Sequence, residues 1–228
     1  MREFLRKYRQ TDKYRQYKEE YLKSPAYRWN CVKVSASQRD LVLSLTREDV
    51  ESMCMQPCHY CGDDPQVVGV LFGLDRVENE GGYTKDNVVT CCSFCNYAKS
   101  DHHVDDFLRI MCNVGATILD DTTWAYNYSF TDTSKQKNPS AFSTYTCRAR
   151  DREMEFHLTK DEFDKITAEP CFYCQRPAPS GVDRIDNHLG YEASNVVSAC
   201  SACNYAKRDW DVDTFWTKAK TIFLKWRG

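Results

Sequence analysis

Residues 73–101 read GLDRVENEGGYTKDNVVTCCSFCNYAKSD, and residues 181–209 read GVDRIDNHLGYEASNVVSACSACNYAKRD. Both stretches carry Asp-Arg, Gly-Tyr, Asn-Val-Val and Cys-x-x-Cys-Asn-Tyr-Ala-Lys in the same order, so the chain contains an internal duplication. Upstream, LSLTREDVESMCMQPCHYC at 43–61 matches FHLTKDEFDKITAEPCFYC at 156–174. The duplication predicts two small modules with the same fold.

The two copies differ in length at one place. Cys58 matches Cys171 at an offset of 113 residues, whereas Asp75 matches Asp183 at an offset of 108. The second copy is therefore five residues shorter between its halves, which is the difference between these offsets. Length differences between related copies occur mostly in surface loops, so we expect a loop here in each module.

Each copy contains two Cys-x-x-Cys pairs. The eight cysteines are Cys58, Cys61, Cys92, Cys95, Cys171, Cys174, Cys200 and Cys203. Four thiolates in two such pairs suit tetrahedral Zn²⁺, because each pair turns its backbone around the metal. The alternative, reduced cysteines in a core, would not require a doubled spacing. We therefore predict two zinc ions, and their role is structural because four thiolates leave no position for water.

Composition places the chain among soluble globular proteins. It has 228 residues, of which 42% are hydrophobic and 28% charged, with a mean hydropathy of -0.65. No run approaches the roughly 20 apolar residues of a membrane span, and the first residues lack the apolar core of a secretory signal. We expect an intracellular protein, cytoplasmic or nuclear, with no membrane partner.

Charge is unevenly distributed, although the formal net charge is only -2. Residues 1–57 hold 12 basic and 8 acidic side chains, and residues 171–228 hold 8 and 6. A polyanion should meet these two parts of the chain more readily than the acidic middle.

The repeat suggests an α+β fold with two tandem zinc-stabilised modules and flanking helices. We expect a basic N-terminal helical segment (1–30), a first module (31–119), a linker rich in Ser, Thr, Asn and Lys (120–149) and a second module (150–228). The tyrosines of the N-terminal segment could pack on the first module, or the segment could contact nucleic acid.

Local patterns place elements within each module. Residues 40–45 and 153–158 alternate like strands, and each stretch is followed by a threonine that can cap a helix. Thr159 with Glu162 has the spacing of a capping box, and Thr46 with Asp49 is its counterpart. An apolar helical pattern follows each copy.

These motifs together resemble the zinc-containing HNH endonuclease family, whose ββα-metal site lies between the two halves of the zinc knuckle. The resemblance covers about 58–101 and 171–209, and the flanking segments look like phage and large-virus members of the family. It implies that an Asp at the end of the first strand and an Asn on the helix hold a divalent cation. The implied ligands, for Mg²⁺ or Mn²⁺, are Asp75 with Asn96 and Asp183 with Asn204.

The resemblance assigns further roles. Asn87 and Asn195 match the loop residue that orients the general base, and Lys99, Lys207 and Arg208 could reach a phosphodiester. The base itself, usually a His, is replaced by Arg76 and Arg184. Arginine stays protonated, so it can stabilise a phosphate but cannot take a proton from water. The residues that could substitute as base are His102, His103, His188, Glu78 and Asp186.

The expected function is metal-dependent cleavage of DNA by one or both modules, with RNA as another possible substrate. The alternative is a catalytically inactive zinc protein of HNH ancestry that binds nucleic acid or forms part of an assembly. The sequence leaves open the recognised sequence or structure, the general base and the oligomeric state.

Overall fold

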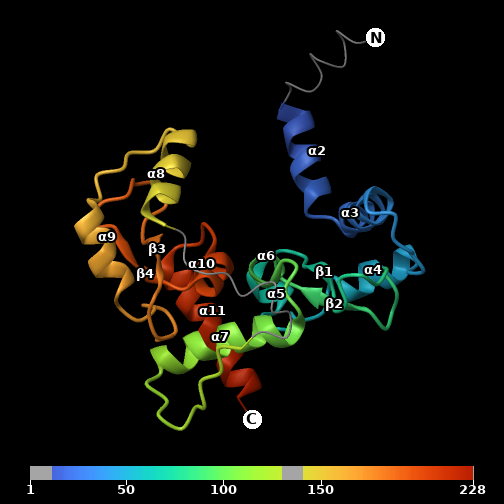
Figure 1. Cartoon of the computed structure of the whole chain (residues 1–228). Helices are drawn as coiled ribbons and strands as arrows, with labels where there is room; N and C mark the ends of the chain where they lie inside the picture. The colour runs from blue at the N-terminus through green and yellow to red at the C-terminus, as the bar shows by residue number, and fades with distance from the viewer. Residues whose placement is uncertain (1–11, 130–140, 228) are drawn as a thin grey trace. The chain divides into compact units, whose positions relative to one another are not determined.

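The structure is a computed structural model that describes residues 12–129 and 141–227. The chain divides into two compact units, residues 1–96 and 97–228. In chain order, the elements are α2 (Asp12–Leu22), α3 (Pro25–Gln38), α4 (Arg47–Met53), α5 (Pro65–Val68), β1 (Gly73–Arg76), β2 (Val88–Cys91), α6 (Ser93–Lys99), α7 (Val104–Ile118), α8 (Phe142–Asp151), α9 (Lys160–Thr167), β3 (Gly181–Arg184), β4 (Val196–Ala199), α10 (Ser201–Lys207) and α11 (Val212–Trp226). The fold is mixed α+β, with two small two-stranded sheets (Figure 1).

The duplicated sequence forms the same ββα arrangement twice. Strands β1 and β2 are antiparallel, with Asp75 opposite Val89, and β3 and β4 repeat this register with Asp183 opposite Val197. A helix follows the second strand in each copy, α6 in the first and α10 in the second. The β-hairpin between the cysteine pairs therefore presents Asp75 and Asp183 at equivalent positions.

The cores of the two copies correspond position by position. The first is built from Val32, Ala36, Leu45, Val50, Leu74, Tyr83 and Val88 with buried Cys54. The second is built from Tyr145, Ala149, Leu158, Phe163, Val182, Tyr191 and Val196. Each residue of the second list lies 113 or 108 residues after its partner in the first. The two copies therefore have similar backbones, and different side chains fill their cores.

The repeat extends one helix further upstream than the motifs indicated. Helix α8 lies mostly within residues 120–149, the stretch expected to be a linker, and it buries Tyr145 and Ala149 in the second core. Helix α3 supplies the equivalent Val32 and Ala36 to the first core. The apolar positions of α8 are sparse among polar residues, so composition alone suggested a linker. The domain boundaries drawn from the sequence remain a prediction.

The strands expected at 40–45 and 153–158 are much shorter in the structure than the sequence predicted. Each makes a single parallel bridge, Leu43 to Tyr83 and Phe156 to Tyr191. Asp40 and Glu153 take positive φ values of 52° and 54° just before these segments, and the capped helices α4 and α9 begin just after them. Too few extended residues remain for a ladder. Both predicted capping boxes are confirmed.

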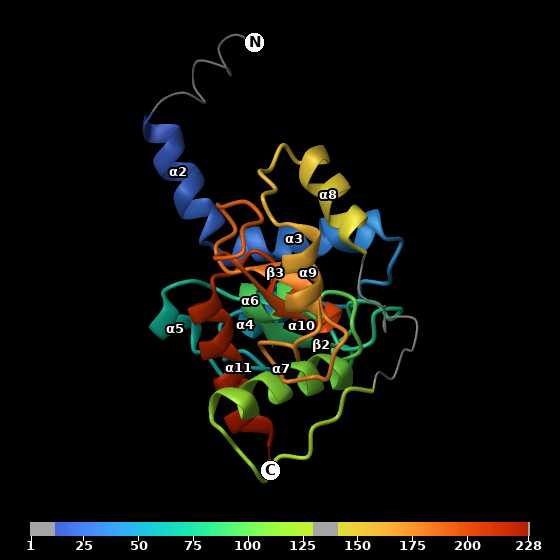
Figure 2. The ribbon, with the colours of Figure 1, turned by 60° about the vertical axis from the view of Figure 1, so that its left-hand side comes forward.

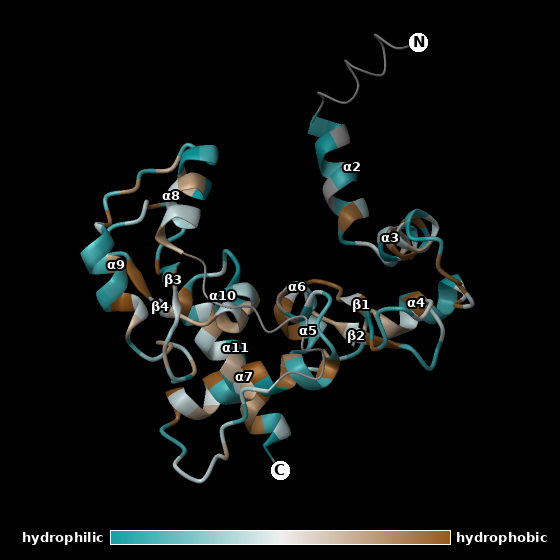
Figure 3. Cartoon of the chain, viewed as in Figure 1, coloured by the Kyte–Doolittle hydropathy of each residue, from teal (hydrophilic) through white to brown (hydrophobic). Residues whose placement is uncertain are grey.

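Helices α7 and α11, which follow the two copies in sequence, pack against each other in the second unit (Figure 2). Apolar residues alternate with polar ones along both helices (Figure 3). A Cβ on Gly115 of α7 would lie 2.4 Å from Phe223 Cβ and 2.6 Å from the Ala219 carbonyl oxygen of α11. Gly115 therefore allows this close approach.

Residues 1–11 of the expected N-terminal helical segment lie outside the described residues. Helix α3 crosses the expected boundary at residue 30, and Trp29 packs against the first core. Within the described ranges, 12–129 and 141–227, no helix is long and apolar enough to cross a membrane.

Candidate functional site

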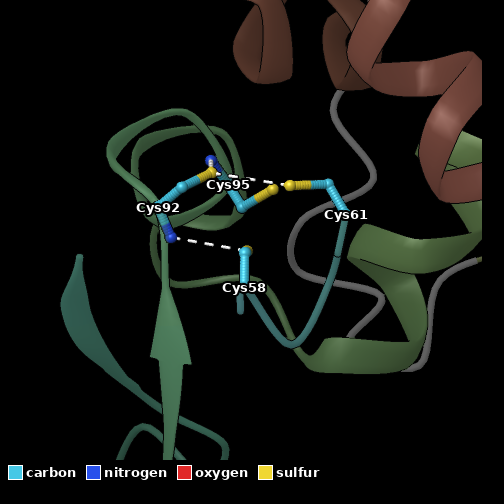
Figure 4. Close-up of side chains that lie close together, drawn as sticks. All are labelled: Cys58, Cys61, Cys92 and Cys95. Carbon is cyan, nitrogen blue, oxygen red and sulfur yellow. Dashed lines mark hydrogen bonds between the residues drawn. The ribbon is translucent and has the colours of Figure 1, made fainter. Parts of the chain in front are cut away.

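The first cysteine quartet forms one buried cluster. The four sulfur atoms lie within 4.8 Å of one another, and the side chains converge from the two knuckles (Figure 4). Cys61 Sγ is 3.7 Å from Cys92 Sγ. Four sulfurs bound to one zinc at roughly 2.3 Å stand about 3.8 Å apart in a tetrahedron. The cluster therefore has the dimensions of a zinc site.

The second quartet, Cys171, Cys174, Cys200 and Cys203, has the same geometry. Cys174 Sγ is 3.8 Å from Cys200 Sγ. The side-chain hydrogen bond from Cys61 is the main cause of a lowered pKa for Cys58, and that from Cys174 does the same for Cys171. In each cluster the neighbouring thiols thus favour one sulfur as the thiolate, which is the form that binds zinc. Both clusters can hold structural zinc.

Backbone amides tie the clusters to the following helices. Cys95 N–H donates to Cys92 Sγ at 3.4 Å, and Cys203 N–H donates to Cys200 Sγ at 3.5 Å. The next residue in each helix is the candidate cation ligand, Asn96 or Asn204. Zinc bound by these thiolates would fix the first turn of the helix and therefore the position of the asparagine.

Both asparagines lie against the strand that carries the aspartate. Asn96 Nδ2 donates to the Leu74 carbonyl at 3.3 Å, and Asn204 Nδ2 donates to the Val182 carbonyl at 3.0 Å. Leu74 and Val182 directly precede Asp75 and Asp183. The predicted Asp and Asn pairs are therefore brought together in both copies, with the amide nitrogen of each asparagine bonded to the strand.

The aspartates are buried and hydrogen-bonded to tyrosines. Asp75 and Asp183 are each 6% exposed. Tyr60 Oη donates to Asp75 Oδ2 at 2.6 Å, and Tyr173 Oη donates to Asp183 Oδ2 at 2.7 Å. Burial, followed by the adjacent carboxylate, raises the pKa of both phenols, so they remain donors. Sequence reasoning missed these tyrosines, although the shared Cys-x-Tyr-Cys spacing could have indicated them.

In the second copy the carboxylate also meets a lysine. Lys207 Nζ is 3.0 Å from Asp183 Oδ2 and 3.0 Å from the Arg184 carbonyl oxygen. Burial raises the pKa of Asp183, and the charge of Lys207 partly offsets this rise. The carboxylate is therefore held in a network of buried donors.

By their spacing Lys99 and Lys207 could reach a phosphodiester, and this role remains a prediction. Both side chains are fully buried, and the Lys207 ammonium is paired with Asp183. Residue spacing placed them one turn beyond the asparagine but could not reveal which side of the helix the core covers. Arg208 is half-buried, and its guanidinium carbon lies 3.6 Å from the Tyr205 ring centroid and 5.0 Å from that of Tyr97.

The arginines at the base position bind the loop between the strands. Arg184 Nη1 donates to the carbonyls of Asn187 at 2.8 Å and Leu189 at 2.7 Å. Arg76 Nη1 makes the equivalent bonds to Asn79 and, at 2.9 Å, to Gly81. Each guanidinium also lies over a tyrosine ring, Tyr83 or Tyr191.

The loop asparagines bind the backbone of the same loop. Asn195 Oδ1 accepts from Asp186 N–H at 2.9 Å, while its amide nitrogen donates to the Asp186 and Gly190 carbonyls. Asn87 makes the matching bonds to Glu78 and Gly82. These asparagines therefore orient the loop that the arginine holds. Among the residues considered as a base, His102 is 4% exposed, while His188 is exposed at the loop.

The chain matches no protein-family model. The uncharacterized protein R423 of Acanthamoeba polyphaga mimivirus is 32% identical over 182 residues, covering 78% of this chain and 33% of that protein. The chain thus spans about a third of the length of this viral relative.

A solved structure of the rare-cutting HNH restriction endonuclease PacI is also similar. It matches with a TM-score of 0.33 and 18% identity, over 36% of this chain and 70% of the PacI chain.

Proposed function

We propose that the chain is an HNH-type, metal-dependent DNA endonuclease with two zinc-stabilised modules. The observation that carries the proposal is the repeated placement of an asparagine, next to the last zinc thiolate, against the strand that bears an aspartate. A ββα unit that brings one carboxylate and one amide carbonyl together is suited to phosphodiester chemistry. RNA is the other candidate substrate.

The chain's own residues have separable roles in this proposal. Asp183 and Asn204 offer hard oxygen ligands of the kind that Mg²⁺ or Mn²⁺ binds, and such a cation supplies positive charge to a phosphoryl group. Tyr173 orients the carboxylate through its 2.7 Å hydrogen bond. Arg184 holds the loop beside the strand and carries a permanent charge that can stabilise a phosphate. The first module repeats these roles with Asp75, Asn96, Tyr60 and Arg76.

A second candidate function is a catalytically inactive zinc protein of the same ancestry that binds nucleic acid. The ion pair between Lys207 and Asp183 favours it, because a buried ammonium competes with a cation for the carboxylate. In this case the Asp-Arg centres are scaffold that connects the strand, the loop and the zinc-held helix.

The test is a cleavage assay on plasmid, single-stranded and branched DNA with Mg²⁺ or Mn²⁺. We expect nicks that require the added cation and disappear in the double variant Asp75→Asn/Asp183→Asn. Asparagine keeps the size of the side chain and can still accept from the tyrosine hydroxyl, so the cysteine clusters should be retained. Because the variant loses the ion pair between Asp183 and Lys207, its zinc content and its denaturant unfolding are measured beside its activity. Asp161→Asn, which changes an exposed carboxylate in the first turn of α9, is the matched control and should cut normally.

Chelation alone would be ambiguous, because EDTA can also remove the structural zinc. Zinc content should therefore be measured in every sample, and activity should return when Mg²⁺ is added in excess of the chelator. A protein that holds two zincs and retains DNA in a gel-shift assay, yet cuts none of the three substrates, contradicts the endonuclease proposal and supports the second candidate.

A further inference from the structure

A third group of metal-binding side chains lies outside the cysteine clusters. Glu155, His157 and Glu192 each offer one ligand atom, and these atoms lie within 4.8 Å of one another. His157 Nε2 is 3.5 Å from Glu155 Oε2. All three residues belong to the second unit, so their arrangement depends on that unit alone.

The backbone explains why these side chains meet. Glu155 and His157 flank Phe156, whose bridge partner Tyr191 directly precedes Glu192. Tyr191 N–H donates to the Glu155 carbonyl at 2.9 Å, and His157 N–H donates to the Tyr191 carbonyl at 2.9 Å. Alternate residues of an extended segment share a face. The bridge therefore holds the two segments in fixed register.

A close backbone approach reinforces this register. A Cβ on Gly190 would lie 2.4 Å from the Glu155 carbonyl oxygen, so a larger residue would push the loop away. Two carboxylates held this close repel each other unless positive charge lies between them. Glu155 and His157 have side chains that are 76% and 65% exposed, so an ion from solution can reach them.

We propose that Glu155, His157 and Glu192 form a third, exchangeable site for a divalent cation of the Zn²⁺ class. One imidazole nitrogen and two carboxylate oxygens are ligands that Zn²⁺ takes in proteins, and three protein ligands leave a position for water. A cation here would connect the segment before α9 to the loop held by Arg184. The inference does not depend on the proposed nuclease function.

The first module lacks this ligand set although it shares the backbone. The equivalent positions hold Val42, Ser44 and Thr84, and they have the same degrees of exposure as their counterparts. Leu43 makes the equivalent bridge to Tyr83, and Gly82 makes the equivalent close approach to Val42. The first module therefore serves as an internal control for the second.

The test is equilibrium dialysis of the full chain, already carrying its two cluster zincs, against a series of buffered free Zn²⁺ concentrations. Elemental analysis should show saturation at three zincs per chain. His157→Ala and Glu192→Gln should each weaken the third binding step by about 100-fold or more. Loss of an outer-shell partner usually costs about 10- to 100-fold in metal affinity, and loss of a direct ligand should cost more. His188→Ala changes another exposed histidine of the same unit and should still bind three.

Saturation of the unaltered chain at two zincs would overturn the proposal, as would a third zinc that binds His157→Ala with unchanged affinity. A transplant sharpens the test. The triple variant Val42→Glu/Ser44→His/Thr84→Glu should saturate at four zincs, because the first module has the same backbone bridge. Saturation at three would contradict the inference that this backbone arranges the ligands.

Discussion

The two modules have cores with the same layout, and side chains of different size fill them. In the first core, Val32 and Val50 occupy the positions that Tyr145 and Phe163 fill in the second. Val182 N–H also donates a hydrogen bond to the hydroxyl oxygen of Tyr145, with an N···O distance of 3.1 Å. The second module therefore adds a polar link between α8 and β3 to a more aromatic core.

The comparison shows which features tolerate change. Core volume, the length of the segment after the first knuckle and the residues at 42, 44 and 84 all differ between the copies. The cysteine quartet, the tyrosine bonded to the aspartate and the arginine bonded to the loop are the same in both. The shared features connect the zinc cluster to the aspartate, and the variable ones surround this connection.

The largest effect is expected from loss of a zinc ligand. Cys95→Ser and Cys203→Ser should each remove one zinc and unfold one module, because structural zinc sites in peptides contribute apparent free energies of roughly 10–16 kcal/mol. Elemental analysis and amide hydrogen exchange resolved by module provide the measurement. Cys147→Ser, at an exposed cysteine, should keep both zincs. Loss of both zincs from a single substitution would show that the modules do not fold separately.

Removal of one partner of the buried ion pair should have the next largest effect. Asp183→Ala leaves the Lys207 ammonium buried without its carboxylate and should cost about 3–5 kcal/mol of unfolding free energy. The double variant Asp183→Ala/Lys207→Met should recover part of this loss, since it removes the unpaired charge. Denaturant unfolding measures both. Equal stability of the single and double variants would mean that the pair is not coupled in solution.

An exchange of residues between equivalent core positions tests whether each core accepts the side chain of the other. Phe163→Val gives the second core the residue of the first and should cost about 2 kcal/mol through the cavity it leaves. Val50→Phe overfills the first core, where Val50 is fully buried, and should cost about 1–3 kcal/mol. Thermal or denaturant unfolding of each variant gives the result. A neutral outcome for both would indicate cores that repack freely.

The smallest expected effects concern the two capping boxes. Thr46→Ala and Thr159→Ala should each cost about 1 kcal/mol, because one helix N–H loses its acceptor. The hydrogen bond from Thr159 lowers the pKa of Glu162, and the contact with Lys85, followed by Thr46, lowers that of Asp49. A carboxyl group whose pKa is lower in the folded state stabilises the fold at pH values above its ordinary pKa.

This contribution should disappear as the pH falls through the lowered pKa. The penalty of each threonine substitution should therefore shrink in acid, which unfolding measured across a pH series can check. A penalty that grows as the pH falls would contradict the assigned contacts.

The sequence by itself determined the duplication, the two cysteine quartets and the helix caps. Each depends on residues close together in the chain or on a spacing that thiolate chemistry makes specific. The pairing of Asp75 with Asn96 and of Asp183 with Asn204 was also anticipated, although only through a family resemblance, and their catalytic role remains a prediction.

Only the tertiary structure decided which polar groups are buried and which segments join a core. It placed Lys207 inside against Asp183, brought α8 into the second core and gathered His157 with two glutamates. It also paired α7 with α11 at Gly115. These outcomes depend on contacts between residues far apart in the chain, and their free energy comes from packing and desolvation that no local pattern encodes.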